Sequence, residues 1–184
     1  MKQKDHKALA HYLLDRSNEA RVWKSATNRR LFFFGCIFPD LFFPTYLRGF
    51  PKSRAMLGHH ARYSQRKIEK TEHRLRFHGV RSFWDCFRLG TLMHYLSDSF
   101  TYSHTDGFEG SMGDHRRYER AFHPHFSRRL SAERDTVLDD YEPLGDGWLS
   151  HCRRDYEQGV CGFDRDCDYI LRLCGTLFLE LCHT

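Results

Sequence analysis

The sequence lacks the cysteine pattern of a zinc ribbon or of a small disulfide-stapled domain. Its seven cysteines are an odd number, and no two of them form a Cys-x-x-Cys pair. A zinc site built on cysteine pairs is therefore excluded, and a complete disulfide framework is not expected. The first residues, MKQKDHKALAHYLLDRS, contain no uninterrupted apolar run of the kind that marks a signal peptide. We therefore expect a cytoplasmic protein with reduced thiols.

Membrane-spanning runs and strand-like alternation are also missing. The apolar run Leu31–Phe43 is too short to cross a bilayer. No segment alternates strictly between polar and apolar residues, whereas helical spacing is frequent, and no internal repeat is present. A chain of 184 residues, 40% of them hydrophobic, is long enough to bury one core. The sequence predicts a single all-α helical bundle over residues 1–184.

Caps, breakers and apolar spacing predict where the helices lie. We expect a first helix that Asp5 caps and that ends near Arg16. A buried helix should end before Pro39, because proline breaks helices. Further helices are expected over Ala61–Arg76, Phe83–Tyr102 and Asp164–His183, with a close helix contact at Gly90. Another helix should begin after the cap Asp114, with breaks at Pro124 and Pro143. In the helix over Asp164–His183, Ile170, Leu173, Leu177 and Leu181 have core spacing, and Cys167 and Cys174 are expected to be buried thiols.

A dense group of potential metal ligands lies between Gly90 and Glu119. His94 and Asp98 are four residues apart in an apolar run with helical spacing, and His115 and Glu119 repeat that interval. Residues four apart lie one turn above each other on a helix. Each pair would therefore direct an imidazole and a carboxylate toward one spot, with His104 between the two pairs.

This combination of residue types suits zinc. Zinc binds imidazole nitrogen and carboxylate oxygen where thiolates are absent, and a catalytic zinc keeps one position for water. Two ligands on successive turns are held rigidly, as in the His-Glu-x-x-His motif. The alternative is a buried helix whose histidines are simply hydrogen-bonded. Two such pairs and His104 within one short stretch favour a multi-metal site instead.

The segment HYLSDSFTYSH, followed by HRRYE, resembles the core of the zinc-dependent phospholipase C family. That family has His-x-x-x-Asp, a second histidine six residues on, and then His-x-x-x-Glu, which correspond here to His94, Asp98, His104, His115 and Glu119. The resemblance implies further ligands upstream, namely His11 in the first helix, Asp40 after Pro39, and His60. His60 is favoured over the adjacent His59, although the sequence alone does not separate the two.

The resemblance also implies how two or three zinc ions would be held. Asp40, His60, His94 and Asp98 would bind one ion, His104, His115 and Glu119 a second, and His11, the N-terminus and a shared Asp98 a third. Met1 stands at a suitable distance before His11 for its amine to take part. Asp40 is the candidate general base. The predicted activity is phosphodiester hydrolysis by metal-activated water.

Four further histidines are not predicted to bind metal. His73 and His78 have no counterpart in the resembling family and are expected at the surface. His123 and His125 flank Pro124 outside the matched segments. These four residues are therefore not counted as ligands.

The substrate and three rival functions remain open. A phospholipid fits the resemblance, and the net charge of +5 is compatible with any phosphate ester. A single-strand nuclease shares the ligand order and would need aromatic platforms, for which Phe100, Tyr102 and Phe108 are available. A non-catalytic bundle with structural zinc or none is a second rival. A di-iron bundle is a third, but it would need Glu-x-x-His pairs and several glutamates, whereas the ligand-rich stretch has His-x-x-x-Asp and His-x-x-x-Glu instead.

Overall fold

The structure is a computed structural model that describes residues 1–17, 20–41, 61–133 and 143–182, with residues 61–63 described by their backbone alone. Its elements are α1 (Gln3–Arg16), η1 (Arg21–Lys24), α2 (Ala26–Leu41), α4 (Ala61–His78), α5 (Phe83–Ser99), η3 (Tyr102–His104), α6 (Met112–Glu133), α7 (Trp148–Gln158) and α8 (Phe163–Cys182), where η marks a 3₁₀-helix. No strand occurs in these ranges, so the predicted all-α class is confirmed. None of the described helices is long and apolar enough to cross a membrane.

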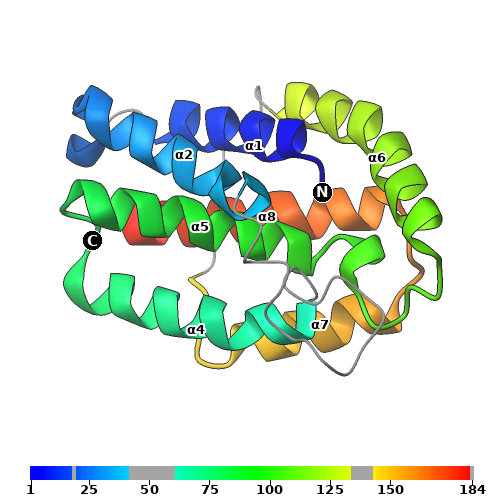
Figure 1. Cartoon of the computed structure of the whole chain (residues 1–184). Helices are drawn as coiled ribbons and strands as arrows, with labels where there is room; N and C mark the ends of the chain where they lie inside the picture. Colours follow the sequence, from blue (N-terminus) through cyan, green and yellow to red (C-terminus); the bar gives the residue numbers. More distant parts are fainter. Residues whose placement is uncertain (18–19, 42–60, 134–142, 183–184) are drawn as a thin grey trace.

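Helix α5 is the centre of the bundle. Figure 1 shows α2 crossing on one side of it and α4 running along the other, and α5 also contacts α8. Its second half, from Leu89, is almost entirely buried, including polar residues such as His94, Ser97 and Asp98. A central helix with buried polar groups needs partners for them, because an unpaired buried polar group is costly. Those partners form the site described below.

Two glycines allow α2 and α5 to touch backbone to backbone. A Cβ atom on Gly90 would lie 2.1 Å from the carbonyl oxygen of Phe32, and one on Gly35 would lie 2.3 Å from that of Phe87. Any larger residue at either position would force the helices apart. The predicted close contact at Gly90 is confirmed, and it brings the end of α2 against the polar half of α5.

Helix α8 supplies much of the core. Ile170, Leu173 and Leu177 are fully buried and Leu181 is 1% exposed, so the predicted core spacing is confirmed. Phe178 stacks on Trp23 at a centroid distance of 5.5 Å. Cys167 and Cys174 are buried free thiols, as predicted, and burial raises the pKa of Cys167 to about 12.

Several predicted helix limits were wrong. Helix α2 continues through Pro39 to Leu41, and α6 continues through Pro124 to Glu133. Helix α5 ends at Ser99 and not at Tyr102. The cap of α6 is Ser111 and not Asp114. The Ser111 hydroxyl accepts from the Asp114 N–H, and the Asp114 carboxylate accepts from the Ser111 N–H. Asp114 therefore completes a capping box from inside the helix.

Candidate metal centre

The first group of ligands forms where one turn of α5 faces α1. His94 Nε2 lies 3.3 Å from Asp98 Oδ2, as expected for residues four apart on a helix. The other ring nitrogen of His94, Nδ1, donates to the backbone carbonyl of Cys36 on α2 at 2.9 Å. That hydrogen bond fixes the ring, and in a neutral His94 it leaves the Nε2 lone pair directed at Asp98.

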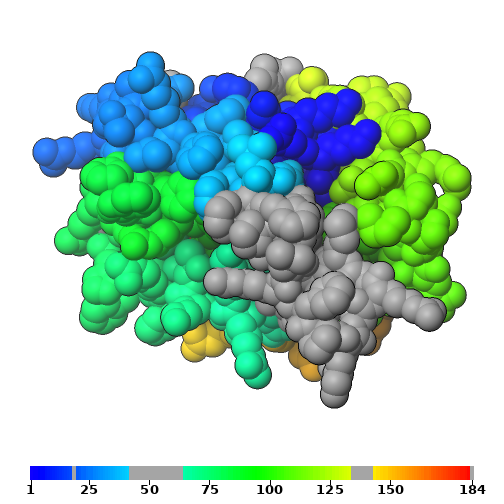
Figure 2. Space-filling model, in the orientation of Figure 1, coloured from blue at the N-terminus to red at the C-terminus, as the bar shows by residue number. Residues whose placement is uncertain are grey.

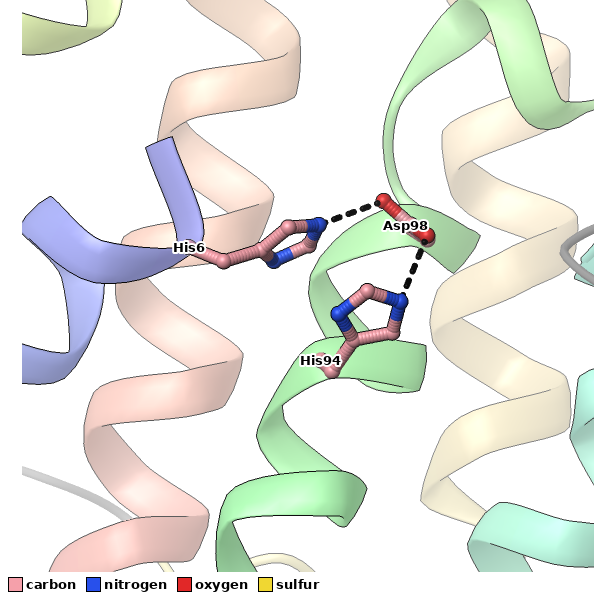
Figure 3. A group of neighbouring side chains, drawn as sticks. All are labelled: His6, His94 and Asp98. Atoms are coloured by element: carbon pink, nitrogen blue, oxygen red, sulfur yellow. Dashed lines mark ion pairs between the residues drawn. The ribbon is translucent and has the colours of Figure 1, made fainter. Parts of the chain in front are cut away.

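His6 of α1 completes this group (Figure 3). Its Nε2 lies 3.3 Å from Asp98 Oδ1, and its ring stacks on that of His94 at a centroid distance of 4.0 Å. The Ser97 hydroxyl donates its proton to the His94 carbonyl oxygen. Toward His6 Nδ1, which lies 3.3 Å away, the hydroxyl oxygen therefore acts as the acceptor. His6 therefore carries its proton on Nδ1 and presents an unprotonated Nε2 to the group. Burial, followed by the charge of His94, lowers the pKa of His6 and keeps it neutral.

His11 is not brought into the site, which corrects the sequence prediction. Its side chain is exposed and contacts Phe33 at a ring distance of 5.0 Å. Five residues separate His6 from His11, which is about 1.4 helical turns, so the two side chains leave α1 on different faces. The buried face of α1 is the one that carries His6.

Asp40 reaches the same group from the last turn of α2. Its Oδ1 lies 3.8 Å from His94 Nε2 and its Oδ2 lies 4.0 Å from His6 Nε2, with 17% of the side chain exposed. The structure thus brings Asp40, His94 and Asp98 together as predicted. Their role as ligands, and that of Asp40 as a base, stays a prediction. His59 and His60 lie outside the described residues.

The second group joins η3 to the first turns of α6. His104 Nε2 lies 3.3 Å from Glu119 Oε1, and His115 Nε2 lies 3.2 Å from the same oxygen. The three residues offer ligand atoms that all lie within 4.8 Å of one another. The predicted pairing of His115 with Glu119 on one turn, and the approach of His104 to it, are both present.

The Met1 amine lies between the two groups. It is 2.8 Å from Asp98 Oδ1, 3.0 Å from Glu119 Oε1 and 2.8 Å from His104 Nε2. Burial would lower the pKa of this amine, but Asp98 and Glu119 outweigh burial and raise it to about 11. Burial and the neighbouring ammonium lower the pKa of His104 to about 4, so the imidazole is neutral and accepts from the amine.

Both carboxylates are held in the ionised form. Burial alone would raise the pKa of Asp98, but the Met1 ammonium and the nearby histidines hold it well below its ordinary value. Burial would also raise the pKa of Glu119, but the Met1 ammonium and the contact with His115 at 3.2 Å lower it. Ionised carboxylates beside neutral imidazoles are the protonation states that divalent metal ions require.

The first group could hold a cation between its members. The Nε2 atoms of His6 and His94 both face the Asp98 carboxylate at 3.3 Å. Within the described part of the chain, His6 Nε2 is buried and has no hydrogen-bond partner. Such an orphaned atom is unusual in a folded protein. Imidazole nitrogen and carboxylate oxygen without thiolate fit zinc.

The sequence matches the family model described as Zinc dependent phospholipase C over residues 5–158. The chain belongs to the zinc dependent phospholipase C family. Membership of this family supports zinc-dependent, phosphodiesterase-like chemistry as the general class of activity. No curated protein and no solved structure matches the chain. The two clusters are therefore interpreted from the family and from this structure alone.

The buried carboxylate of Asp166 accepts hydrogen bonds from residues that adjoin the second group. Asp166 of α8 accepts from the hydroxyls of Tyr156 at 2.6 Å and Tyr118 at 2.8 Å, and from the backbone N–H of Tyr102 at 3.1 Å. Tyr102 begins the 3₁₀ turn that carries His104, and Tyr118 precedes Glu119. Burial raises the pKa of Asp166 to about 6 against the hydrogen bonds that lower it. Sequence analysis did not single out Asp166, because nothing near it in the chain indicates these partners.

The four histidines that were not counted as ligands belong to neither group. His123 pairs with the buried Asp5 of α1, and His125 pairs with Asp164 at 2.8 Å. His73 and His78 are exposed on α4. The Asp5–His123 pair nevertheless links α6 to the residue next to His6, so it helps to hold the start of α1 in place.

Proposed function

We propose that the protein is a zinc-dependent phosphoesterase that hydrolyses phosphodiesters in the manner of a phospholipase C. The observation that carries this proposal is the pair of adjoining ligand groups, with Asp98 Oδ1 only 3.8 Å from His104 Nε2 of the second group. His6, Asp40, His94 and Asp98 would hold zinc on one side, with His60 as a further candidate. His104, His115 and Glu119 would hold it on the other. Two nearby zinc ions supply a clamp for a phosphoryl group and a nucleophilic water near neutral pH.

The protein residues have separate tasks in this proposal. The Cys36 carbonyl and the Ser97 hydroxyl orient His94 and His6, so both rings are in place before substrate arrives. Asp40 is the one carboxylate of the first group with appreciable exposure, 17% against 2% for Asp98. This exposure supports a role for Asp40 in accepting a proton from a water at the edge of the site. We retain Asp40 as the candidate base.

A phospholipid is the favoured substrate. The three aromatic residues that the sequence offered as nuclease platforms are engaged within the protein. Phe100 is fully buried, and the Tyr102 hydroxyl donates to the Gly107 carbonyl at 3.0 Å. Phe108 contacts His115 at a ring distance of 6.1 Å but also packs on Tyr102 and Tyr118. These contacts are consistent with core packing rather than with base stacking.

Zinc quantification beside hydrolysis of p-nitrophenylphosphorylcholine tests the proposal. The purified protein should contain more than one zinc per chain and release p-nitrophenol. His94→Ala should lose zinc and reduce turnover by at least about 100-fold, since even an outer-sphere partner of a metal site contributes roughly 10–100-fold. His125→Ala is a matched control, because His125 pairs with an exposed carboxylate away from both groups.

Four outcomes would count against the proposal. Full activity of His94→Ala at full zinc content would remove the first group from the reaction. Iron in place of zinc would favour a di-iron bundle, and absence of metal would favour an inert one. Cleavage of single-stranded DNA without cleavage of the choline ester would point to a nuclease.

A further inference from the structure

Helices α2 and α5 expose a continuous group of aromatic rings. Phe34 is 41% exposed, Phe83 45% and Trp84 56%, and Phe38 and Phe87 connect them. Ring centroids are 5.9 Å apart between Phe34 and Phe87 and 5.2 Å apart between Phe83 and Trp84. We call these five residues the aromatic face. Large aromatic side chains in contact with one another at a surface mark an interaction site more often than single exposed residues do.

The aromatic face leads to the metal centre along α2. Phe34 and Phe38 lie one turn apart on this helix, and Asp40 follows two residues later. Leu41, the last residue of α2, is 56% exposed. A groove lined by Phe38, Pro39, Phe87 and Tyr95 joins the face to the residue that precedes Asp40. A molecule held on the face would thus lie at the same end of α2 as Asp40, although Phe38 and Asp40, two positions apart, leave the helix on different sides.

Basic residues border the aromatic face. Arg30 lies one turn before Phe34 on α2, Arg81 precedes Phe83, and both are exposed. Arg88, one turn after Trp84, is 38% exposed in its side chain and pairs with Asp85 at 2.9 Å. Lys67 of α4 is exposed, and its amine lies 3.9 Å from the centre of the Tyr95 ring at the groove. Figure 2 shows the surfaces of α2 and α5 adjoining on this side of the molecule.

We propose that the aromatic face docks the protein on an anionic phospholipid bilayer. Tryptophan and phenylalanine partition into the headgroup region of bilayers, and nearby arginine and lysine are attracted to anionic lipids. Docking there would bring phospholipid headgroups to the Asp40 end of α2 without extraction of the lipid. The choice of lipid as partner rests on the proposed function, but docking itself needs no hydrolysis. A second copy of the chain is disfavoured because pairing two such faces would bring their arginines together.

Trp84 is a built-in reporter for this proposal. The chain has three tryptophans, and Trp23 and Trp148 are only 2% and 8% exposed. With the zinc-loaded protein and vesicles of phosphatidylcholine and phosphatidylglycerol, Trp84 emission should shift to shorter wavelength. Vesicles with brominated acyl chains should quench it. Vesicles of phosphatidylcholine alone should bind more weakly, since the basic border would lack its partner.

A double variant and a matched control test which surface binds. Phe34→Ser with Phe83→Ser keeps Trp84 and should lower vesicle partitioning, measured by co-sedimentation, by about tenfold or more, as expected for two large apolar groups. Val160→Ser should bind like the wild type. Val160 is 90% exposed and lies in the turn between α7 and α8, away from the aromatic face.

The possible failures are distinguishable. Absence of vesicle binding by the wild type, or equal loss in Val160→Ser and in the double variant, would overturn docking. So would a wild-type dimer in sedimentation velocity that the double variant dissociates, because a second copy would then cover the face. Hydrolysis of the soluble choline ester without vesicle binding would overturn docking alone. Vesicle binding without hydrolysis would overturn the proposed function alone.

Discussion

His6 and His11 lie on the same helix and differ in which face they occupy. His6 is 1% exposed beside Asp98, whereas His11 is exposed beside Phe33. We predict that His6→Ala weakens zinc binding by at least about 10–100-fold, the range seen even for outer-sphere partners. His11→Ala should bind zinc like the wild type. Competition with a chromogenic zinc chelator measures both, and the reverse ranking of the two variants would contradict this assignment.

The ion pairs of the Met1 amine can be tested through the pH dependence of stability. Its pKa is raised from 8.0 to about 11 by Asp98 and Glu119 despite burial. In protein without zinc, the amine of the folded state therefore keeps its proton between about pH 8 and pH 11, whereas the amine of the unfolded state loses it. Stability from these ion pairs should be complete below about pH 8 and should fall as the pH rises toward 11.

Urea unfolding of zinc-free protein at pH 8 and at pH 10.5 measures this loss. A matched chain with Gly-Ser added before Met1 places an uncharged amide where the amine lies, so it should be less stable at pH 8 and lose less stability between the two pH values. Equal pH dependence in the two chains would show that the amine does not contribute.

Only part of the candidate site was predictable residue by residue. The interval of four residues placed His94 with Asp98 and His115 with Glu119, because a helix fixes that geometry locally. The choice between His6 and His11 depended on which face of α1 packs inward. Apolar residues such as Leu9, Leu13 and Ala10 define that face, and His6 lies one turn before them. Weighing each histidine against this stripe would have favoured His6.

At the scale of helices, the crossing of α2 and α5 sets the distance between Asp40 and His94. We predict that Gly90→Ala destabilises the protein by about 1–3 kcal/mol or more, because its Cβ would collide with the Phe32 carbonyl. The helix propensity of alanine, a gain of about 1 kcal/mol over glycine, would only partly offset this. Zinc affinity of the first group should fall as well.

Gly113→Ala is the matched control for this crossing. Gly113 lies in α6, where a Cβ would meet only the Ser111 hydroxyl at an ordinary 3.5 Å. This variant should be as stable as the wild type or slightly more stable in thermal melts followed by circular dichroism. Equal stability of the two variants would mean that the contact between α2 and α5 is not as close as described.

A variant of Asp166 tests whether its hydrogen bonds hold the second group in place. We predict that Asp166→Ala lowers stability by several kcal/mol, because two tyrosine hydroxyls and one N–H lose their acceptor at about 1–3 kcal/mol each. Zinc binding by His104, His115 and Glu119 should weaken. Asp168→Ala, which removes only the exposed pair with Arg129, should cost about 1 kcal/mol or less. If both variants bound zinc equally well, Asp166 would have a structural role alone.

Helix ends at prolines were the least predictable feature of the elements. A proline removes one backbone hydrogen bond and usually breaks a helix. In α6 the loss is compensated by packing, since Phe122 and Phe126 on either side of Pro124 are fully buried and stacked at 5.2 Å. Such tertiary compensation has no local signal. Pro39 lies in the last turn of α2, so only two residues of the helix follow it.

At the scale of the whole molecule, the residues that match the family do not make up the whole core. The match ends at residue 158, and α8 follows it. The helical class and the core spacing of α8 were predictable, because periodicity is a property of the local sequence. The link from Asp166 to the turn of His104 was not, because it joins residues more than sixty positions apart.

We predict that a chain ending after Gln158 does not fold cooperatively. It would lose Phe178, which is fully buried between Trp23 and Phe32, as well as Asp166. Thermal melts and size-exclusion chromatography compare this chain with the full one. A cooperative melt with full zinc content in the shortened chain would contradict the view that α8 is integral to the domain.

The most direct test of the central claim is anomalous X-ray diffraction from zinc-loaded crystals at the zinc absorption edge. We expect one anomalous peak among His6, His94 and Asp98 and another among His104, His115 and Glu119. Zinc located elsewhere, or in neither group despite saturating zinc, would contradict that claim.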